Sequence, residues 1–301
     1  MSGENTANGG GRVVVVGNNT VDWVYRVRGP TGPNGKTRAE SLTIHAGGQA
    51  ANVAYNLAVL GGTVEYVGAF GDDDASAFTR RSLEKAGVGL DRCVVVPGCS
   101  AHHACVTVDT STGTRSIVMY KDDRLRLGPG VVTGDLLKNA ALIYLDNHEE
   151  VASLAAIELA RDRRIPIVAD LEEISEYTSA IIPGVDTLIA PKDVLERLAG
   201  ESDPVRMTRV IQGLGPAAVV ATAGAQGAFG LDGDGEVFHM ASHRCAVRDT
   251  TGAGDAFHAA YVMAMLNGHD FRSRLRFAAR VAAAKCGVDG PRLTPDAAAL
   301  L

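Results

Sequence analysis

Short apolar runs of strand length alternate with helix-length amphipathic or Ala-rich stretches almost from one end of this chain to the other. Such alternation is typical of βαβ units, in which each helix crosses back over a parallel sheet. It therefore predicts an α/β fold with a doubly wound, mostly parallel sheet flanked by helices. The expected strands span residues 13–16, 64–67, 141–145, 165–169, 187–189 and 217–221, and the expected helices span residues 50–60, 75–86, 151–162, 205–212, 256–267 and 272–286.

Two stretches, residues 23–44 and 100–120, break this alternation. Both have the period-two pattern of half-buried strands, with turn residues between the strands. We expect them to form a small antiparallel sheet, inserted into one domain of residues 12–301, that could cover a cleft as a lid or supply a dimer surface. The polar, glycine-rich residues 1–11 are expected to be a disordered leader.

The composition is that of a large soluble globular chain. Its 301 residues include 46% hydrophobic and 21% charged residues, and no apolar stretch approaches the roughly 20 residues of a membrane span. Five scattered cysteines without a CxxC pair indicate reduced thiols, and we expect a cytoplasmic protein without a membrane partner. A net charge of −6 argues against a nucleic-acid partner but leaves small anionic ligands open.

The most informative segment is residues 249–257 (DTTGAGDAF), which leads directly into an apolar helix. Gly252 and Gly254 allow a tight turn that presents amides at a helix N-terminus, where the helix dipole favours a phosphate. Asp255, expected to be ionised and of ordinary basicity, could accept a proton from a hydroxyl held there. The structural alternative is a simple helix start with Asp255 as its N-cap.

Three other segments are candidates for ligand binding. In GGQAAN at residues 47–52, paired glycines allow close backbone approach and Asn52 offers a donor and an acceptor to sugar hydroxyls. Asp22 follows the first strand and could bind two adjacent hydroxyls. The glycine turn at residues 221–228 could floor a nucleotide pocket or enter a β-hairpin. The alternative for residues 47–52 is a loop that only starts a helix, and the alternative for Asp22 is an exposed aspartate in a turn.

Several tempting motifs do not hold. Residues 29–37 resemble a P-loop, but the first glycine is one residue too far away and a strand-like pattern follows. Residues 72–74 are three consecutive aspartates, which could suggest a metal site. They precede an expected helix, however, where aspartates are favoured as N-caps and by the helix dipole. No G-x-G-x-x-G follows the first strand, which argues against a nicotinamide dehydrogenase.

The residues resemble the ribokinase-like (PfkB) carbohydrate kinases. The segments at residues 13–22, 47–52, 67–73, 221–227 and 249–257 are similar to the successive signatures of that family, in the same order. The resemblance implies transfer of the γ-phosphoryl group of ATP to a sugar hydroxyl, with Mg²⁺ and often a stimulatory cation such as K⁺. It also implies a β lid that often mediates homodimerisation.

The same resemblance implies roles for individual residues. Asp255 would be the catalytic base, and Gly252, Ala253 and Gly254 would form the anion hole. Sugar-binding positions match Asp22, Gly47, Gly48 and Asn52, and nucleotide-binding positions match Thr222, Gly224, Gly227 and Cys286. Asp249 is the expected position for a monovalent cation.

One family motif is altered. Many members carry an Asn-x-x-Glu motif that organises magnesium-bound water, but here Lys192 replaces the asparagine and Glu196 is displaced by one position. Asp170 and Glu172 are therefore the expected contributors to a magnesium site. Ketohexokinase-like members also deviate at this motif, and residues 112–117 and 284–287 are similar to that branch, which favours a ketose or another small monosaccharide.

Two other functions remain open at this point. A nucleoside kinase of the same fold would need aromatic or apolar lid residues to stack a base, and the chain has only 5% aromatic residues and a single tryptophan, Trp23. A non-catalytic sugar-binding or regulatory protein could use the same scaffold. Lys36, Lys121 and Arg124 on the expected lid could meet an anionic substituent or be solvated surface charges.

Overall fold

The computed structural model describes residues 11–301, apart from residues 30 and 113. The expected leader therefore lies outside the described residues except for Gly11. An eight-stranded sheet runs through the molecule in the order β14-β13-β12-β11-β10-β9-β1-β4. Its strands are β1 (Arg12–Val16), β4 (Val64–Val67), β9 (Ala140–Leu145), β10 (Ile167–Asp170), β11 (Thr187–Pro191), β12 (Ala218–Thr222), β13 (Ala228–Leu231) and β14 (Val237–Met240).

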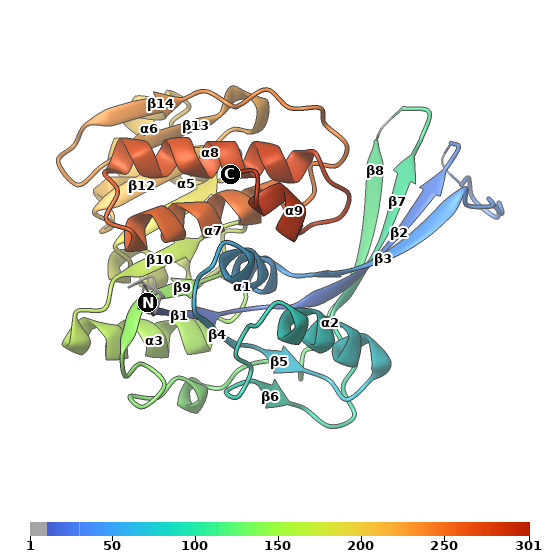
Figure 1. The fold of residues 1–301 in the computed structure, drawn as a ribbon, viewed down its shortest axis with the longest axis horizontal. Coiled ribbons are helices and arrows are strands. Elements are labelled where there is room, and N and C mark those ends of the chain that lie inside the picture. Colours follow the sequence, from blue (N-terminus) through green and yellow to red (C-terminus); the bar gives the residue numbers. More distant parts are fainter. Residues whose placement is uncertain (1–10, 30, 113) are drawn as a thin grey trace, which may run out of the picture.

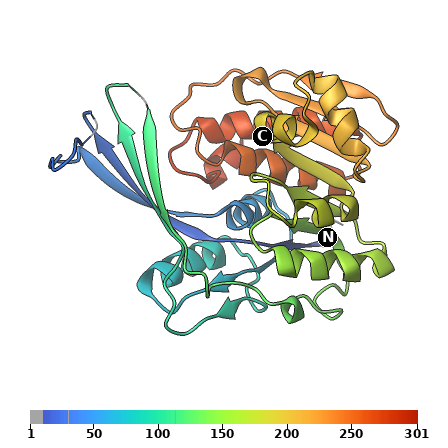
Figure 2. The same ribbon diagram turned by 180° about the vertical axis from the view of Figure 1, so that it is seen from behind.

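Within this sheet the neighbouring strands β12, β11, β10, β9, β1 and β4 are parallel, and β13 and β14 add an antiparallel edge. Helices cover both faces of this sheet (Figures 1 and 2). One face carries α1 (Gln49–Val59), α2 (Asp74–Lys85), α7 (Ala253–Leu266), α8 (Phe271–Cys286) and α9 (Pro295–Ala298). The other carries α3 (Glu150–Arg163), α4 (Thr178–Ile181), α5 (Lys192–Ala199) and α6 (Pro204–Gln212).

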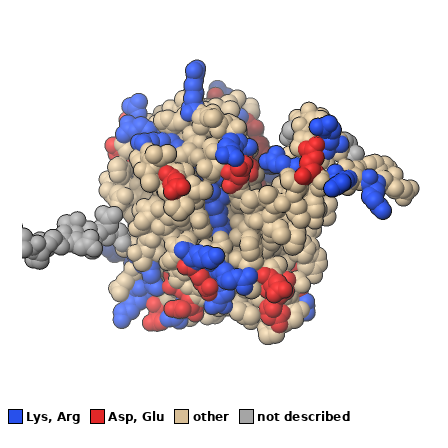
Figure 3. Space-filling model, turned by 45° about the vertical axis from the view of Figure 1, so that its right-hand side comes forward, with Lys and Arg blue, Asp and Glu red and all other residues tan. Residues whose placement is uncertain are grey.

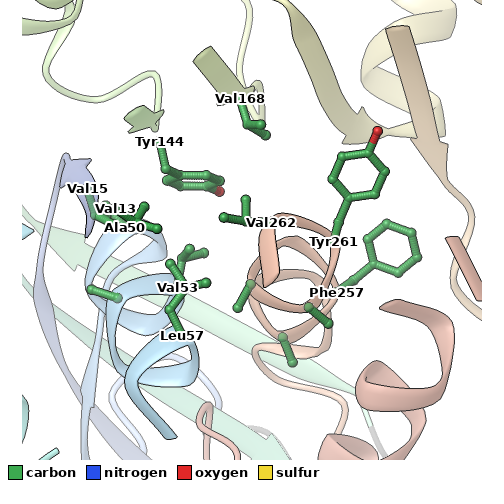
Figure 4. Packing of buried hydrophobic residues seen from close by; sticks show 14 of the residues in the cluster. Val13, Val15, Ala50, Val53, Leu57, Tyr144, Val168, Phe257, Tyr261 and Val262 are labelled. Carbon is green, nitrogen blue, oxygen red and sulfur yellow. The ribbon is translucent and has the colours of Figure 1, made fainter. Parts of the chain in front are cut away.

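The first strand shows why its sequence is continuously apolar. Val13 and Val15 pack into the core beneath α1, α7 and α8, while Val14 and Val16 pack into the core on the α3 side. A parallel strand covered on both faces has no solvent-facing position for a polar residue. Figure 4 shows the first of these cores, with Tyr144 and Val168 of the sheet lying against α7.

A second sheet forms the arm that projects from the main body (Figure 1). It contains β2 (Thr20–Val27), β3 (Ser41–Gly47), β7 (His103–Asp109) and β8 (Arg115–Tyr120), in the order β3-β2-β7-β8. Two antiparallel hairpins are joined by a parallel pairing between β2 and β7. We call this sheet the lid.

The ends of each expected helix and strand lie within three residues of the observed ends. The structure also tests the interpretations of the acidic run, the P-loop-like segment and the glycine turn. Asp73 caps α2 by accepting a hydrogen bond from the Ser76 amide at 2.8 Å, which confirms the capping interpretation of the acidic run. The strand β3 follows the P-loop-like segment, so no P-loop helix exists there. The glycine turn after β12 enters a β-hairpin with β13. The expected elements did not include the helices α4, α5 and α9, the edge strands β13 and β14, or the short strands β5 (Ala69–Phe70) and β6 (Val94–Val95).

Charges on the surface are mixed. On the side of the molecule drawn in Figure 3, acidic and basic side chains are interspersed and do not gather into one basic field. None of the helices in the described part of the chain combines the length and the apolar character that a membrane crossing requires.

Candidate active site

A cavity of about 790 Å³ lies between the lid and the N-termini of α1 and α7. The carboxyl ends of the central strands lie at its base, where α/β sheets of this kind bind ligands. Of the residues singled out in the sequence, those lining it are Asp22, Gly48, Asn52, Lys121, Glu172, Asp249, Gly252, Gly254 and Asp255.

The N-terminus of α7 forms one wall of this cavity. Gly252 is the N-cap residue, with φ 72°, and a Cβ atom there would lie 1.9 Å from the carbonyl oxygen of Pro291. Only glycine fits that conformation and that close approach. Asp255 is thus the third residue of the helix and not its N-cap, and no side-chain hydrogen bond caps this helix.

The amides of this turn differ in availability. Within the described part of the chain, the N–H groups of Gly252, Gly254 and Asp255 donate to no protein acceptor. The amide of Ala253 donates to the carbonyl of Thr250 at 3.2 Å. In this structure Gly252, Gly254 and Asp255 supply the free donors, while the expected part of Ala253 in an anion hole stays a prediction that requires its amide to leave Thr250.

The carboxylate of Asp255 is half-buried at the edge of the cavity. Burial, together with the negative charges of Glu172 and Asp146, raises the pKa of Asp255 to about 7. A hydrogen bond from Asn52 and the positive charge of Arg292 act in the opposite direction. The expectation of ordinary basicity is corrected, since an aspartate with this pKa is a stronger base than one in water.

Asn52 and Arg292 form a chain of hydrogen bonds behind this carboxylate. The Asn52 amide nitrogen Nδ2 donates to Asp255 Oδ2 at 2.7 Å, and Asn52 Oδ1 accepts from Arg292 Nε at 2.9 Å. Asn52 thus has one N–H left for a ligand. No sequence pattern indicated Arg292, which lies 240 residues from Asn52 along the chain.

The lid and the start of α1 form the opposite wall. Asp22 lies on β2, and its carboxylate accepts a hydrogen bond from Thr20 Oγ1 at 3.1 Å. Burial raises the pKa of Asp22, while Thr20, His45 and Arg292 oppose this rise. Gly47 pairs with Thr20 across the β2–β3 hairpin and leads into Gly48, the N-cap residue of α1.

Gln49 is a cavity residue that the sequence argument passed over, although it lies inside the GGQAAN segment. Its side-chain nitrogen donates to Glu172 Oε2 at 2.7 Å and lies 3.4 Å from Asp170 Oδ2. Glu172 lines the cavity, whereas Asp170 lies behind the wall. The two carboxylates expected to bind magnesium are therefore held by an amide of the protein.

Asp170 belongs to a buried polar cluster with Tyr144 and His258. The Tyr144 hydroxyl lies 2.8 Å from His258 Nδ1 and 3.5 Å from Asp170 Oδ2. Burial raises the pKa of Asp170 well above its usual range, helped by the charge of Asp255, and lowers the pKa of His258 to about 3. His258 Nδ1 also lies 3.6 Å from Asp170 Oδ2, and burial favours the neutral form of both groups.

In the altered Asn-x-x-Glu region, the glutamate itself is paired within the protein. Lys192 begins α5 directly after β11, and its ammonium is paired with Glu196 one turn later. Residues 11–301, with the exceptions given above, contain no group of three or more His, Cys, Asp or Glu side chains arranged to hold a metal ion. The donor set therefore does not fit a Mg²⁺ ion held by the protein alone.

Asp249 lies at the base of the loop that leads into α7. Its carboxylate accepts hydrogen bonds from the amides of Thr251 and Gly290, both at 2.9 Å. The buried ammonium of Lys285 donates to the carbonyl of Asp249 at 2.8 Å and lies 3.4 Å from that of Val288. These contacts favour a bracing role for Asp249 over a potassium site, because a fixed cation already lies against the same loop.

The expected nucleotide-binding residues lie outside the lining of this cavity and flank the exposed segment 241–252. Thr222 ends β12, and Gly224 and Gly227 form the tight turn that follows it. The start of the segment contacts this turn, since Ser242 Oγ donates to the carbonyl of Ala225 at 2.7 Å. Its end contacts Cys286, whose carbonyl accepts the Arg248 amide at 2.8 Å. The segment then continues into the N-terminus of α7.

Comparisons with known proteins agree with this architecture. The model of the pfkB family carbohydrate kinases matches residues 11–297. A 5-dehydro-2-deoxygluconokinase of Bacillus subtilis (strain 168) is 26% identical over 261 residues, covering 79% of this chain and 80% of that protein. A sugar kinase of Escherichia coli (strain K12) is 30% identical over 274 residues, covering 84% of this chain and 74% of that protein.

Among solved structures, the ribokinase of Arabidopsis thaliana complexed with ribose and ATP superimposes with a TM-score of 0.83 at 23% identity. The match covers 96% of this chain and 98% of that one, and it shows a common fold. With its family model matched over almost the whole described chain, its parallel sheet and its projecting lid, this protein belongs to the pfkB family of carbohydrate kinases.

Proposed function

We propose that this protein transfers the γ-phosphoryl group of ATP to a hydroxyl of a sugar bound between the lid and α7. The observation that carries the proposal is the first turn of α7, where a carboxylate with a pKa of about 7 lies beside three free amides. The same cavity is lined by Asp22 and Gly48 on its other side. A hydroxyl acceptor and an anionic donor would thus meet at Asp255.

Each part of this turn has a task that its chemistry allows. Asp255 would take the proton of the attacking hydroxyl, a contribution worth roughly 10² to 10⁴ in rate. The amides of Gly252, Gly254 and Asp255 would hold the oxygens of the transferred group, with the dipole of α7 favouring their negative charge. The lid would exclude water that could otherwise accept the phosphoryl group.

The nucleotide would lie along Thr222, Gly224, Gly227 and Cys286 and reach α7 along the segment 241–252. The printed ligands of the Arabidopsis thaliana ribokinase, ribose and ATP, support this choice of donor and acceptor class. Mg²⁺ would enter with the nucleotide and neutralise its phosphate charge, because the protein supplies no metal-binding cluster in its described part.

The named relatives narrow the acceptor class. The 5-dehydro-2-deoxygluconokinases act, by name, on a keto acid derived from a sugar. This agrees with the ketose suggested by residues 112–117 and 284–287, of which residue 113 lies outside the described residues. A keto sugar or keto sugar acid is therefore our first candidate.

One observation favours a nucleoside as a second candidate. The lid surface that lines the cavity is largely apolar, with Val24, Val106, Ile117 and Met119 facing it. Such a surface could cover a base, which the sequence argument required of a nucleoside kinase. An adenosine kinase of Sinorhizobium meliloti shares the fold, with a TM-score of 0.83 at 19% identity.

An ADP-release assay over ketoses, aldoses, pentoses, 5-dehydro-2-deoxygluconate, sugar phosphates and nucleosides tests the proposal. We expect turnover on a keto sugar or its acid, and on few other acceptors. Turnover on nucleosides alone would select the second candidate. If the folded protein releases no ADP with any acceptor of the panel, both candidates are contradicted and a binding or regulatory protein is favoured.

We also propose that the lid pairs with the lid of a second copy. The face turned away from the cavity exposes Leu42, Ile44 and Val118, at 46%, 40% and 72% of their surface, beside Trp23 and Tyr25. A continuous apolar sheet face of this kind is costly in water. Light scattering at micromolar concentration should give the mass of a dimer for the native chain and of a monomer for Val118→Asp.

A further inference from the structure

Arg292 is a buried guanidinium without an acidic partner. Its side chain is only 8% exposed, and none of the ion pairs formed by the described residues includes it. It donates to Asn52 Oδ1 and, through Nη1, to Ser82 Oγ at 2.7 Å, and it lies 4.8 Å from the centre of the Tyr55 ring. Its Nη2 has no hydrogen-bond partner in the described part of the chain. Burying a charge with so few partners lowers the free energy of unfolding, which indicates that Arg292 has a function to offset this cost.

Its position relative to the cavity indicates what that role is. Arg292 does not line the cavity, so it cannot reach a bound ligand directly. Asn52 lies between it and Asp255, which does line the cavity. Any effect of Arg292 on the reaction must therefore pass through Asn52 or through its charge.

The hydrogen-bond chemistry of the three side chains has a fixed direction. A guanidinium can only donate, and an ionised carboxylate can only accept. Arg292 therefore forces the amide of Asn52 to present its oxygen to the guanidinium and its NH₂ group to Asp255. If the amide flipped, its oxygen would face the carboxylate and both hydrogen bonds would be lost.

We propose that Arg292 is a positioning residue, which locks the Asn52 amide so that its NH₂ group holds Asp255 in the ionised, hydroxyl-accepting state. The proposal rests on Asp255 being the base of the proposed kinase. In the absence of Arg292, Asp255 would keep its buried position but lose a fixed donor and a nearby positive charge.

Other charged groups act on the same carboxylate, and they set the scale of the expected change. Glu172 and Asp146 oppose ionisation of Asp255, and Arg292 favours it. Asp170 lies close enough to respond to the charge of Asp255 but is itself held neutral by burial, and Lys285 also lies within electrostatic range. Arg292 remains protonated at neutral pH, although burial lowers its pKa to about 10.

The test variant is Arg292→Met, which removes the charge and the hydrogen-bond donors. Two control variants accompany it. Arg292→Lys retains a charge and a donor, and Ser82→Ala removes only the contact to Nη1. In Arg292→Met we expect the acidic limb of the kcat profile to move up by about one pH unit. Turnover at pH 6 should accordingly fall about tenfold, with little change at pH 9. Arg292→Lys and Ser82→Ala should retain the native limb. A folded Arg292→Met with the native limb would overturn the inference.

A second measurement does not depend on turnover. Titration of ¹³C-labelled aspartate carboxyls by NMR, with the Asp255 signal assigned from Asp255→Asn, should show the same upward shift of the Asp255 pKa in Arg292→Met. The shift should be smaller when Asn52→Leu is already present, because the effect is transmitted by that amide. Equal shifts in both backgrounds would contradict transmission through Asn52.

These outcomes separate the two proposals. If the native protein releases no ADP with any acceptor, the kinase proposal fails while the NMR titration still tests the Arg292 chain. If Arg292→Met does not fold, as judged by circular dichroism, Arg292→Gln takes its place, and an unshifted Asp255 titration in that variant overturns the inference.

Discussion

The first turns of α7 have two sides with opposite chemistry. On the cavity side, Asp255 is linked to a charged guanidinium through Asn52, and the pKa of its carboxyl lies near 7. On the packed side, one turn further along, His258 meets Tyr144 and Asp170 in a cluster that burial keeps neutral. Both sides contain a buried aspartate, yet only one lies next to a cation and an opening.

The difference shows that burial alone does not produce a reactive carboxylate. Desolvation is the largest influence on the pKa of Asp170 and of Asp255, and it raises both. Asp255 remains able to ionise near neutral pH because Asn52 and Arg292 favour its charged form. Asp170 has only long polar contacts, with Tyr144, Gln49 and His258, and burial favours its protonated form.

Substituting the two aspartates should break the comparison most clearly. Asp255→Asn should lower kcat by 10² to 10⁴ without unfolding the protein, because the base is lost and the amide keeps the shape. Asp170→Asn should leave kcat within about tenfold of the native value, because burial favours the neutral carboxyl of Asp170 and an amide has nearly the same shape. Turnover by native protein should itself rise as the pH rises through about 7, where Asp255 loses its proton.

Steady-state ADP release and thermal unfolding of both variants provide the measurement. An Asp255→Asn variant with more than about a tenth of native turnover would contradict the assignment of the base. An Asp170→Asn variant as inactive as Asp255→Asn would show that the packed side takes part in the reaction, for example through a metal ion.

The two glycines of the same turn sharpen the comparison with a smaller effect. Gly252 faces the packed side, where a Cβ would meet Pro291 at 1.9 Å, so Gly252→Ala should lower the unfolding temperature by several degrees. At Gly254 no atom lies within 4 Å of such a Cβ, which would project into open space. Gly254→Ala should therefore leave the unfolding temperature unchanged or slightly higher, because alanine favours the helix.

For Gly254→Ala we instead expect a rise of several-fold in KM for ATP, since the added methyl group lies beside the free amides. Differential scanning fluorimetry and initial rates separate the two effects. Native ATP affinity in Gly254→Ala would argue against phosphate binding at this turn, and an unchanged unfolding temperature in Gly252→Ala would argue against the close approach to Pro291.

Much of this fold could be predicted because its signals are local. Four consecutive valines between a polar leader and Gly17 indicated a strand buried on both faces, and β1 extends that run by one residue. The acidic run before α2 indicated a cap, and Asp73 provides it. The helix α5 was missed because it has only eight residues and follows β11 directly, without a turn to separate the two elements.

The candidate site was predictable in outline and not in detail. Asp22, Gly48, Asn52, Gly252, Gly254 and Asp255 were all named from local patterns, and the tertiary structure brings them to one cavity. The pairing of Glu196 with Lys192 and the burial of Asp170 were not visible in any segment. The part of Asp170 and Glu172 in metal binding stays a prediction, because the sequence does not show that Gln49, from another element, contacts both carboxylates.

The amino-acid sequence by itself determined the alternation of strands and helices and the glycine turn that opens α7, because residue period and backbone freedom act over a few neighbouring positions. Only the tertiary structure decided the ionisation of Asp255, the neutrality of the Tyr144 cluster and the presence of Arg292 behind Asn52. Burial and charge act through space, and the groups that set them here are separated by as many as 240 positions in the chain.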